Sequence, residues 1–372
     1  MRSEDGASSL QPPASVGDRT ERELIARIRQ RLPPAPAWML VGIGDDAAVV
    51  EPERNRVDVL SIDTLVDGVH FDRAFVPPDA IGHRALAVNL SDLAAMGAAP
   101  RLALVAMALP AALSLDDFDG IVGGLTSLAA RHRLHIAGGN LTRSPGPLMI
   151  DVAVSGTVKR RQALTRGGAR AGDDVYVSGT IGAAAAGLAM LRQTSAASSS
   201  SGLETFVGPE TWDSRLPYLY PTPRVRLGVL LARNRAASAC MDLSDGLGDG
   251  VSQISEASGV GMAIDADTLP IDDAARTWFR ARTPDEDAAI ASVMAAGDDY
   301  ELLVTARPRM RRRVEAAARH ASVPLTRIGR CTPERAVVYQ RAGGEPRPVP
   351  RGYSHFRPFD QLRVVPSDVE RR

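Results

Sequence analysis

The chain has 372 residues, of which 44% are hydrophobic and 24% are charged, so it can bury a substantial core and form two domains of ordinary size. Its 44 Lys and Arg residues balance 44 Asp and Glu residues, which leaves no net charge to attract nucleic acid or an anionic membrane. The two cysteines, Cys240 and Cys331, have no metal-ligand spacing, so we expect no disulfide framework or zinc site, and a cytoplasmic location. No apolar run approaches the roughly 20 residues of a membrane-spanning helix.

The first predicted domain covers residues 21–158 and follows a polar, Pro- and Ser-rich segment at 1–20, which we expect to be a disordered extension. Apolar periodicity in this domain predicts strands that alternate with helices. The clearest helix starts at Pro78 and stops near Gly97, because Pro favours the first turn of a helix and Gly favours its end. The expected helices lie at 21–32, 78–97 and 115–133, and the expected strands lie at 57–62, 102–109, 134–137 and 148–158.

The second predicted domain covers residues 159–360 and is followed by a polar tail at 361–372. A Ser- and Ala-rich run at 194–202 has nothing to bury, so we expect an exposed flexible loop there, and we expect residues 270–284 to be irregular. The remaining helices are expected at 183–191, 225–232, 247–257, 286–296 and 309–321, and the strands at 175–177, 239–241, 302–304, 325–328 and 337–339. This alternation predicts an α/β fold, but it does not give the order of strands in a sheet.

Four acidic segments, far apart in the sequence, are candidates for chemistry. Asp45 and Asp46 stand between two glycines and an apolar run, where Asp favours neither strand nor helix. Mg²⁺ is usually bound by a few carboxylates together with substrate phosphates, and a buried carboxylate such as Asp92 needs a partner. The other three segments are Ser61-Ile62-Asp63, Asn89-Leu90-Ser91-Asp92 and Asp242-Leu243-Ser244-Asp245. Together they predict a Mg²⁺-phosphate site assembled from four parts of the chain.

The sequence contains none of the common phosphate-binding loops. It has no Gly-x-x-x-x-Gly-Lys-[Ser/Thr] loop, and its single lysine, Lys159, lies in no such context. It also lacks a kinase-type glycine loop and a His-Arg-Asp catalytic loop. A nucleotide would therefore be held by metal, arginine and backbone N–H groups. Residues 179–182, Gly-Thr-Ile-Gly before a predicted helix, are a weak candidate for such N–H groups.

Six blocks of sequence resemble the signature blocks of thiamine-monophosphate kinases, in the order in which that family has them. The family belongs to a wider group with aminoimidazole ribonucleotide synthetase and selenophosphate synthetase. One block alone would be a weak signal, but six in order over residues 21–356 are specific. The blocks are Ile43-Gly44-Asp45-Asp46-Ala47, a segment from Asp63-Thr64-Leu65-Val66 to His70-Phe71, Ala87 to Gly97, Ala163-Leu164-Thr165-Arg166, Asp242 to Leu247, and Asp299-Tyr300-Glu301-Leu302.

The resemblance implies ATP-dependent phosphorylation of thiamine monophosphate to thiamine diphosphate by direct in-line transfer, with Mg²⁺ and ATP as co-substrate. It also implies a two-domain fold with an N-terminal mixed sheet covered by helices on one side, a C-terminal α/β domain, and a homodimer that joins two N-terminal sheets. The acceptor is already an ionised phosphate, so no residue is assigned as an acid or base, and metals and arginine would supply positioning and charge.

The family's functional positions carry over to residues of this chain. Metal ligation is implied at Asp46, Ser61, Ile62, Asp63, Asp92, Asn140, Asp242 and Asp245; nucleotide contact at Gly139, Asn140, Arg166 and Ser244; and contact with thiamine phosphate at His70, Asp298 and Tyr353. Three positions depart from the family, which usually has Thr at Ile62, Asp at Asn140 and Glu at Asp298. A ligand at Ile62 would have to be its backbone carbonyl, Asn140 brings one negative charge fewer, and Asp298 is one methylene shorter.

Plainer interpretations of these residues remain open. Asp45 can simply cap or orient its neighbour, His70 can be a packed imidazole, Arg166 can be a solvated arginine, and Tyr353 can be a core aromatic. Other functions also remain: another ATP-using member of the group, or a protein that binds metal and nucleotide without turnover. The sequence lacks the reactive Cys and Lys near the N-terminus of selenophosphate synthetases, and the C-terminal Cys of hydrogenase maturation proteins.

Overall fold

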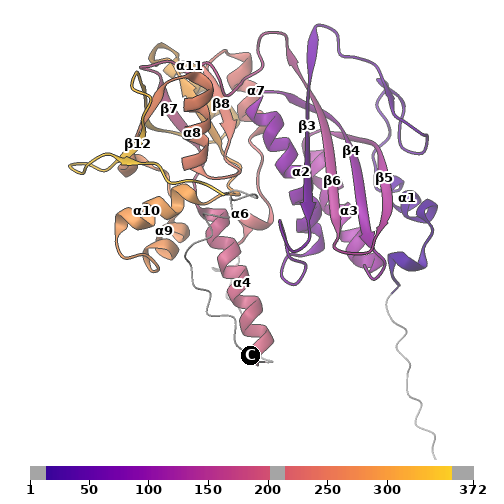
Figure 1. Cartoon of the computed structure of the whole chain (residues 1–372). Helices are drawn as coiled ribbons and strands as arrows, with labels where there is room; N and C mark the ends of the chain where they lie inside the picture. The colour runs from indigo at the N-terminus through magenta and orange to yellow at the C-terminus, as the bar shows by residue number, and fades with distance from the viewer. Residues whose placement is uncertain (1–13, 202–213, 354–372) are drawn as a thin grey trace, which may run out of the picture.

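The computed structural model describes residues 14–201 and 214–353, which form two domains side by side (Figure 1). The N-terminal domain is built on a four-stranded sheet in which only β4 and β5 run parallel. The strand order is β3 (Arg56–Val66), β6 (Met149–Lys159), β4 (Ala99–Pro110) and β5 (His135–Ser144). The predicted mixed sheet is therefore confirmed.

Two helices cover one face of this sheet, as expected (Figure 1). They are α2 (Pro78–Ala95) and α3 (Leu115–Arg131), and both present Leu, Ile, Val and Ala side chains to the strands. A Cβ on Gly82 would lie 1.8 Å from the carbonyl oxygen of Ile121, so glycine at this position lets α2 and α3 approach at backbone distance. The opposite face of the sheet carries no helix of the described residues.

The C-terminal domain has a seven-stranded sheet in which only β12 and β9 are parallel. Its strand order is β13 (Arg347–Pro348), β12 (Val337–Gln340), β9 (Gly261–Asp265), β11 (Leu325–Thr332), β7 (Asp174–Ser178), β10 (Leu302–Ala306) and β8 (Ala239–Asp242). The helices are α4 (Ala183–Ser201), α6 (Leu216–Leu219), α7 (Val225–Arg233), α8 (Leu247–Ser258), α9 (Asp273–Arg280), α10 (Glu286–Ala295) and α11 (Arg311–Ala321). The expected α/β character of this domain is confirmed.

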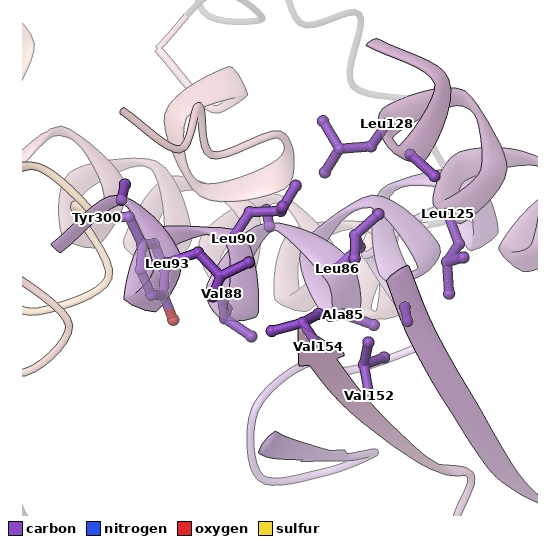
Figure 2. Packing of buried hydrophobic residues seen from close by; sticks show 14 of the residues in the cluster. Ala85, Leu86, Val88, Leu90, Leu93, Leu125, Leu128, Val152, Val154 and Tyr300 are labelled. Atoms are coloured by element: carbon purple, nitrogen blue, oxygen red, sulfur yellow. The ribbon is translucent and has the colours of Figure 1, made fainter. Parts of the chain in front are cut away.

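Helix α2 is the element that joins the two domains. It packs against the N-terminal sheet on one side and against α7 and β8 of the C-terminal domain on the other. Figure 2 shows Leu86, Leu90 and Leu93 of α2 in one cluster with Val152 of the N-terminal sheet and Tyr300 of the C-terminal domain. Side chains on almost every side of α2 are buried, so polar groups on this helix must find partners in one domain or the other.

Three expectations about local structure are corrected. The Ser-rich run expected as a flexible loop continues α4 as far as Ser201, and residues 202–213 lie outside the described part of the chain. Residues 270–284 contain α9, which begins where the Asp272 carboxylate accepts hydrogen bonds from the backbone N–H groups of Ala274 and Ala275. An Asp at this position is a typical helix N-cap and could have predicted α9 from the sequence.

The expected disordered extension at 1–20 is corrected in its last part. A 3₁₀ turn, η1, covers Val16–Asp18, and the Val16 side chain is buried against the first domain. Residues 1–13 and the expected tail at 361–372 lie outside the described residues. Helix α1 (Glu21–Arg29) and the short strands β1 (Met39–Val41) and β2 (Val49–Val50) complete the domain. Within the described ranges, no helix combines the length and the apolar character needed to cross a bilayer.

A buried histidine on α2 contacts the segment that follows α6 in the C-terminal domain. Nε2 of His83 lies 2.8 Å from the carbonyl oxygen of Pro221, and its Nδ1 lies 3.1 Å from a guanidinium nitrogen of Arg131. The carbonyl can only accept and the guanidinium can only donate, so the ring is the neutral tautomer with its proton on Nε2. Burial lowers the pKa of His83, and the positive charge of Arg131 lowers it further.

We expect His83→Gln to change how stability depends on pH. The lowered pKa of the folded protein means that the unfolded chain binds a proton first, so wild type should lose stability as pH falls through 6.5. One proton contributes at most about 1.4 kcal/mol per pH unit. Denaturant unfolding between pH 5 and 7.5 measures this, with His320→Gln, an exposed histidine on α11, as the control. An identical pH slope in wild type and His83→Gln would contradict the prediction.

Candidate active site

Carboxylates from three elements meet where α2 joins the domains. Asp63 points from β3 toward α2, where its carboxyl group lies against that of Asp92. The hydroxyl of Ser61, two residues earlier on the same face of β3, also donates to Asp92. Side chains alternate along a strand, so Ile62 faces the other side, where it is 65% exposed, and only its backbone borders the cluster. The structure therefore brings Ser61, Asp63 and Asp92 together.

The third carboxylate comes from the C-terminal domain. Asp242 at the end of β8 accepts a 2.8 Å hydrogen bond from the hydroxyl of Ser91, the neighbour of Asp92 on α2. Arg166 places its positive charge near Asp92 and donates to the side chain of Gln253. The carboxylate cluster, defined here as Asp63, Asp92 and Asp242, thus spans the domain junction with an arginine beside it.

Burial and mutual repulsion dominate the electrostatics of the carboxylate cluster. Burial, followed by the charge of Asp92, raises the pKa of Asp63 to about 6. The same two causes raise the pKa of Asp242 to about 7. Burial also raises the pKa of Asp92, although the Ser61 hydroxyl and Arg166 oppose this. Such a cluster is poorly compensated by the protein alone and favours a bound cation.

The donor chemistry fits a hard divalent cation, but the protein supplies only part of a coordination shell. Carboxylate and hydroxyl oxygens are the ligands that Mg²⁺ prefers, and it usually keeps waters or substrate phosphates as well. Within residues 14–201 and 214–353, no three His, Cys, Asp or Glu side chains are already arranged as a metal site. A cation at the cluster would therefore depend on phosphate oxygens to complete its shell.

The loop between β8 and α8 carries the next predicted residues. The carbonyl of Ser244 accepts a 2.7 Å hydrogen bond from the backbone N–H of Asp298, and the carbonyl of Asp245 accepts a 3.1 Å bond from that of Tyr353. Tyr353 is half exposed and is the last described residue. The loop therefore joins residues predicted for metal, nucleotide and acceptor.

A second group of contacts links the predicted acceptor residues His70 and Asp298. The hydroxyl of Tyr218 donates to the carbonyl oxygen of His70 over 3.2 Å. Arg84 of α2 donates to the carbonyl of Tyr218 and to Oδ1 of Asp298, the latter over 3.2 Å. Tyr300 also donates to Oδ1 of Asp298, over 2.9 Å. Both acceptor residues therefore belong to one network at the domain junction.

The weak candidate for phosphate-binding N–H groups is not available in this structure. The backbone N–H groups of Gly182 and Ala184, at the start of α4, donate to the buried carboxylate of Asp299 over 2.8 and 3.4 Å. Burial raises the pKa of Asp299 to about 8. An aspartate thus already occupies this helix N-terminus.

The remaining predicted residues line a separate cavity of about 690 Å³ at the β5 edge of the N-terminal sheet. Asp46, Gly139 and Asn140 all border it. The Asp45 carboxylate accepts a 2.9 Å hydrogen bond from the Asp46 backbone N–H, so it orients its neighbour. The apolar lining comes from α1, α3, β4 and β5: Ile25, Ile28, Val105, Met107, Val122, Leu125, Ile136 and Leu141.

The cavity and the carboxylate cluster lie at opposite edges of the same sheet. Asp63 pairs with Val152, Val152 with Val105, and Val105 with Gly139, so Asp63 and Gly139 end one row across four strands. Three strand spacings amount to roughly 14 Å. Asn140 and Asp63 of one chain therefore cannot bind the same metal ion.

Sequence comparison places the chain among enzymes of known type. Residues 44–158 match the family described as AIR synthase related protein, N-terminal domain, and residues 170–340 match the C-terminal domain of the same description. The thiamine-monophosphate kinase of Escherichia coli is 36% identical over 339 residues, covering 90% of this chain and 98% of the relative. The chain belongs to the thiamine-monophosphate kinase family. The resemblance found in the sequence blocks is thereby confirmed, and so is the predicted enzyme class, a thiamine-phosphate kinase.

Solved structures of thiamine-monophosphate kinases share the fold. The crystal structure of the enzyme from Stenotrophomonas maltophilia is 40% identical, with a TM-score of 0.74 over 88% of this chain and 98% of that one. The structure of AaThiL complexed with AMPPCP and TMP is 29% identical, with a TM-score of 0.69 over 84% of this chain and 92% of that one.

Sequence reasoning missed Arg84 and Ser91, which contact predicted site residues from α2. Both stand in an apolar helix, and both side chains are buried. A buried arginine must have partners, so the position of Arg84 within an apolar run could have indicated that it contacts other polar residues.

We expect Asp92→Asn to stabilise the metal-free protein while abolishing turnover. The amide keeps the shape and removes a half-buried negative charge, which should add about 1 kcal/mol to the free energy of unfolding. Because the pKa of Asp63 is raised to about 6, wild type should itself gain stability as pH falls through 6, and the difference should shrink there.

Thermal melting in EDTA between pH 5 and 8, with a turnover assay, measures both effects of Asp92→Asn. Glu315→Gln, an exposed position on α11, is the control and should change neither. Activity like that of wild type, or a loss of stability at pH 8, would remove Asp92 from the proposed site.

Proposed function

We propose that this protein transfers a phosphoryl group from ATP to thiamine monophosphate, in line and with Mg²⁺, to give thiamine diphosphate. The observation that carries the proposal is the carboxylate cluster with Arg166 at the domain junction, beside the network that holds His70 and Asp298. Family membership supports it, as does the relative complexed with AMPPCP, an ATP analogue, and with TMP.

The side chains of this site suit a reaction that needs no strong base. The acceptor is a phosphate that is ionised at neutral pH, so the difficulty is to align two anionic groups that repel each other. Arg166 would pair with phosphate oxygens, for which a guanidinium is well shaped. Among the described residues, the groups that shift the pKa values of the three carboxylates include no histidine, so positioning and charge compensation would carry the reaction.

Mg²⁺ would be held by Asp63, Asp92, Asp242 and Ser61. Asp245 and the backbone carbonyl of Ile62 are close in sequence to Asp242 and Asp63, so they could also be ligands. Bound there, Mg²⁺ would offset the charge that develops on the transferred phosphoryl group. Asp242 is buried, Asp63 and Asp92 are half-buried, and one arginine stands beside the three carboxylates. Phosphates and cation would therefore bind together more favourably than either alone.

The cavity at the β5 edge suits the nucleoside of ATP. Its volume of about 690 Å³ lies within the usual range for a small-molecule site. The apolar lining can contact a purine, while Asp46, Gly139 and Asn140 at the polar side can contact ribose, phosphate or metal. In this proposal Asn140 acts from the nucleotide side, and its missing charge weakens metal binding there.

The separation of cavity and carboxylate cluster supports a homodimer with composite sites. The face of the sheet without helices exposes Leu60 and Ile62 of β3 at 76% and 65%, with Leu104 of β4 exposed at 43%. These apolar side chains share one face of the sheet, with β6 between their two strands, and their exposure favours burial against a second copy. If the two sheets join, the β5 edge of one chain meets the β3 edge of the other, and the nucleotide cavity faces the partner's carboxylate cluster.

Acceptor choice tests the reaction. With ATP and Mg²⁺, ADP release should require thiamine monophosphate, and unphosphorylated thiamine should react at least about a hundredfold more slowly, because its neutral hydroxyl needs a base. Steady-state rates with both acceptors measure this, with ATP alone as the blank. Comparable rates on the two acceptors would exclude the mechanism, and no ADP release with either would leave a binding protein without turnover.

Mixing two inactive variants tests the composite site. Asp63→Asn impairs the cluster and Asp46→Asn impairs the cavity side, so each should be inactive alone. In a mixed dimer one of the two composite sites keeps both intact halves, so an exchanged equal mixture should recover about a quarter of wild-type activity. The activity of the mixture before and after subunit exchange measures this. No recovery despite confirmed mixed dimers would mean that each site is built from one chain.

The cellular location is also part of the proposal. Both cysteines are free and buried, which suits a reducing cytoplasm, and a biosynthetic kinase needs the ATP found there.

A further inference from the structure

Arg84 occupies an unusual place for a charged side chain. It lies on α2, the helix between the domains, and its side chain is only 2% exposed. Its guanidinium carbon lies 4.1 Å from the centre of the Tyr218 ring, and one terminal nitrogen donates to the Tyr218 carbonyl. Its Nε has no hydrogen-bond partner among the described residues. The ring and the carbonyl fix the orientation of the guanidinium but leave its charge to be balanced elsewhere.

The charge is balanced by Asp298 of the other domain, and the contact is one-sided. Arg84 and Tyr300 both donate to Oδ1 of Asp298, over 3.2 and 2.9 Å. Within residues 14–201 and 214–353, no hydrogen bond reaches Oδ2, and the side chain is 34% exposed. The carboxylate is thus held by one oxygen and can offer the other to a ligand.

We propose that Arg84 is a positioning residue for the acceptor, acting through Asp298; this rests on the proposed function. Thiamine monophosphate carries a cationic thiazolium ring and an aminopyrimidine N–H donor, and either suits a carboxylate oxygen that is fixed in direction. Through Tyr218, whose hydroxyl donates to the His70 carbonyl, Arg84 also fixes the backbone of the second acceptor residue.

The same geometry predicts that Arg84 does not influence the nucleotide. Arg84 and Asp92 are eight residues apart on α2, which separates them by about 12 Å along the helix axis. Arg84 does not border the β5-edge cavity. Loss of Arg84 should therefore affect binding of the acceptor and spare that of ATP.

The experiment compares Arg84→Met with wild type in turnover and in direct binding. We expect KM for thiamine monophosphate to rise at least about tenfold, with KM for ATP changed by less than about twofold. Thermal shift without turnover should show a weakened response to thiamine monophosphate and an unchanged response to ADP. Asp298→Asn should have a similar effect, and Arg84→Met should add little to it if the two residues act together.

Arg311→Met is the matched control, since Arg311 pairs with the buried carboxylate of Asp174 over 2.8 Å, away from the junction. It should lower the melting temperature without changing either KM. If Arg84→Met behaves in the same way, Arg84 is structural and the proposal is overturned. If wild type itself does not use thiamine monophosphate, the proposed function fails instead.

Arg84→Lys decides the question if Arg84→Met does not fold. Lysine keeps the charge but lacks the planar pair of N–H groups that reaches both the Tyr218 carbonyl and Asp298. Acceptor affinity reduced several-fold, with unchanged affinity for ADP, supports positioning, whereas unchanged affinity for both overturns it.

Discussion

The burial of α2 on almost every side is the constraint on which this structure depends. A helix between two domains must satisfy each polar side chain with a partner from one of them. Ser91 bonds to Asp242, Asp92 lies against Asp63, and Arg84 pairs with Asp298. Each of these contacts except that of Asp92 and Asp63 crosses the domain junction. The contacts that pack α2 between the domains are therefore also the contacts that bring the candidate site residues together.

Close backbone approach makes this placement of α2 possible. A Cβ on Gly228 of α7 would lie 1.9 Å from the carbonyl oxygen of Ala94 near the end of α2. Only glycine permits that distance, which sets α7 and the adjoining β8 close enough for Asp242 to reach Ser91. An alanine at 228 would push the C-terminal domain away from α2, so a residue far from the chemistry determines the separation of the carboxylates.

The sequence predicted which candidate residues lie together where they stand in recognisable blocks, and it failed to do so where the order of strands in the sheet matters. Asp63, Asp92 and Asp242 were expected together and lie together. Asn140 was expected with them, yet it lies at the other edge of the sheet, because alternating strands and helices do not reveal strand order. Helix α9 was missed because its cap, Asp272, sits in a segment without clear periodicity. The Ser-rich run was predicted to be a loop from its composition alone, and composition does not show that the preceding helix continues into it.

The loop that carries Asp298 has a strained backbone, and buried contacts on either side keep it in place. Asp298 and Tyr300 both have positive φ, of 68° and 51°, and each such residue costs on the order of 1–3 kcal/mol. The flanking carboxylates offset this cost: Asp299 caps α4, and Glu301 pairs with Arg224. Since Asp299, Tyr300 and Glu301 are all fixed by buried contacts, Asp298 has little freedom to move. In the proposed site, a shorter Asp would reach the acceptor only if its carboxylate is held where a longer Glu could reach by itself, and the hydrogen bond from Arg84 would hold it there.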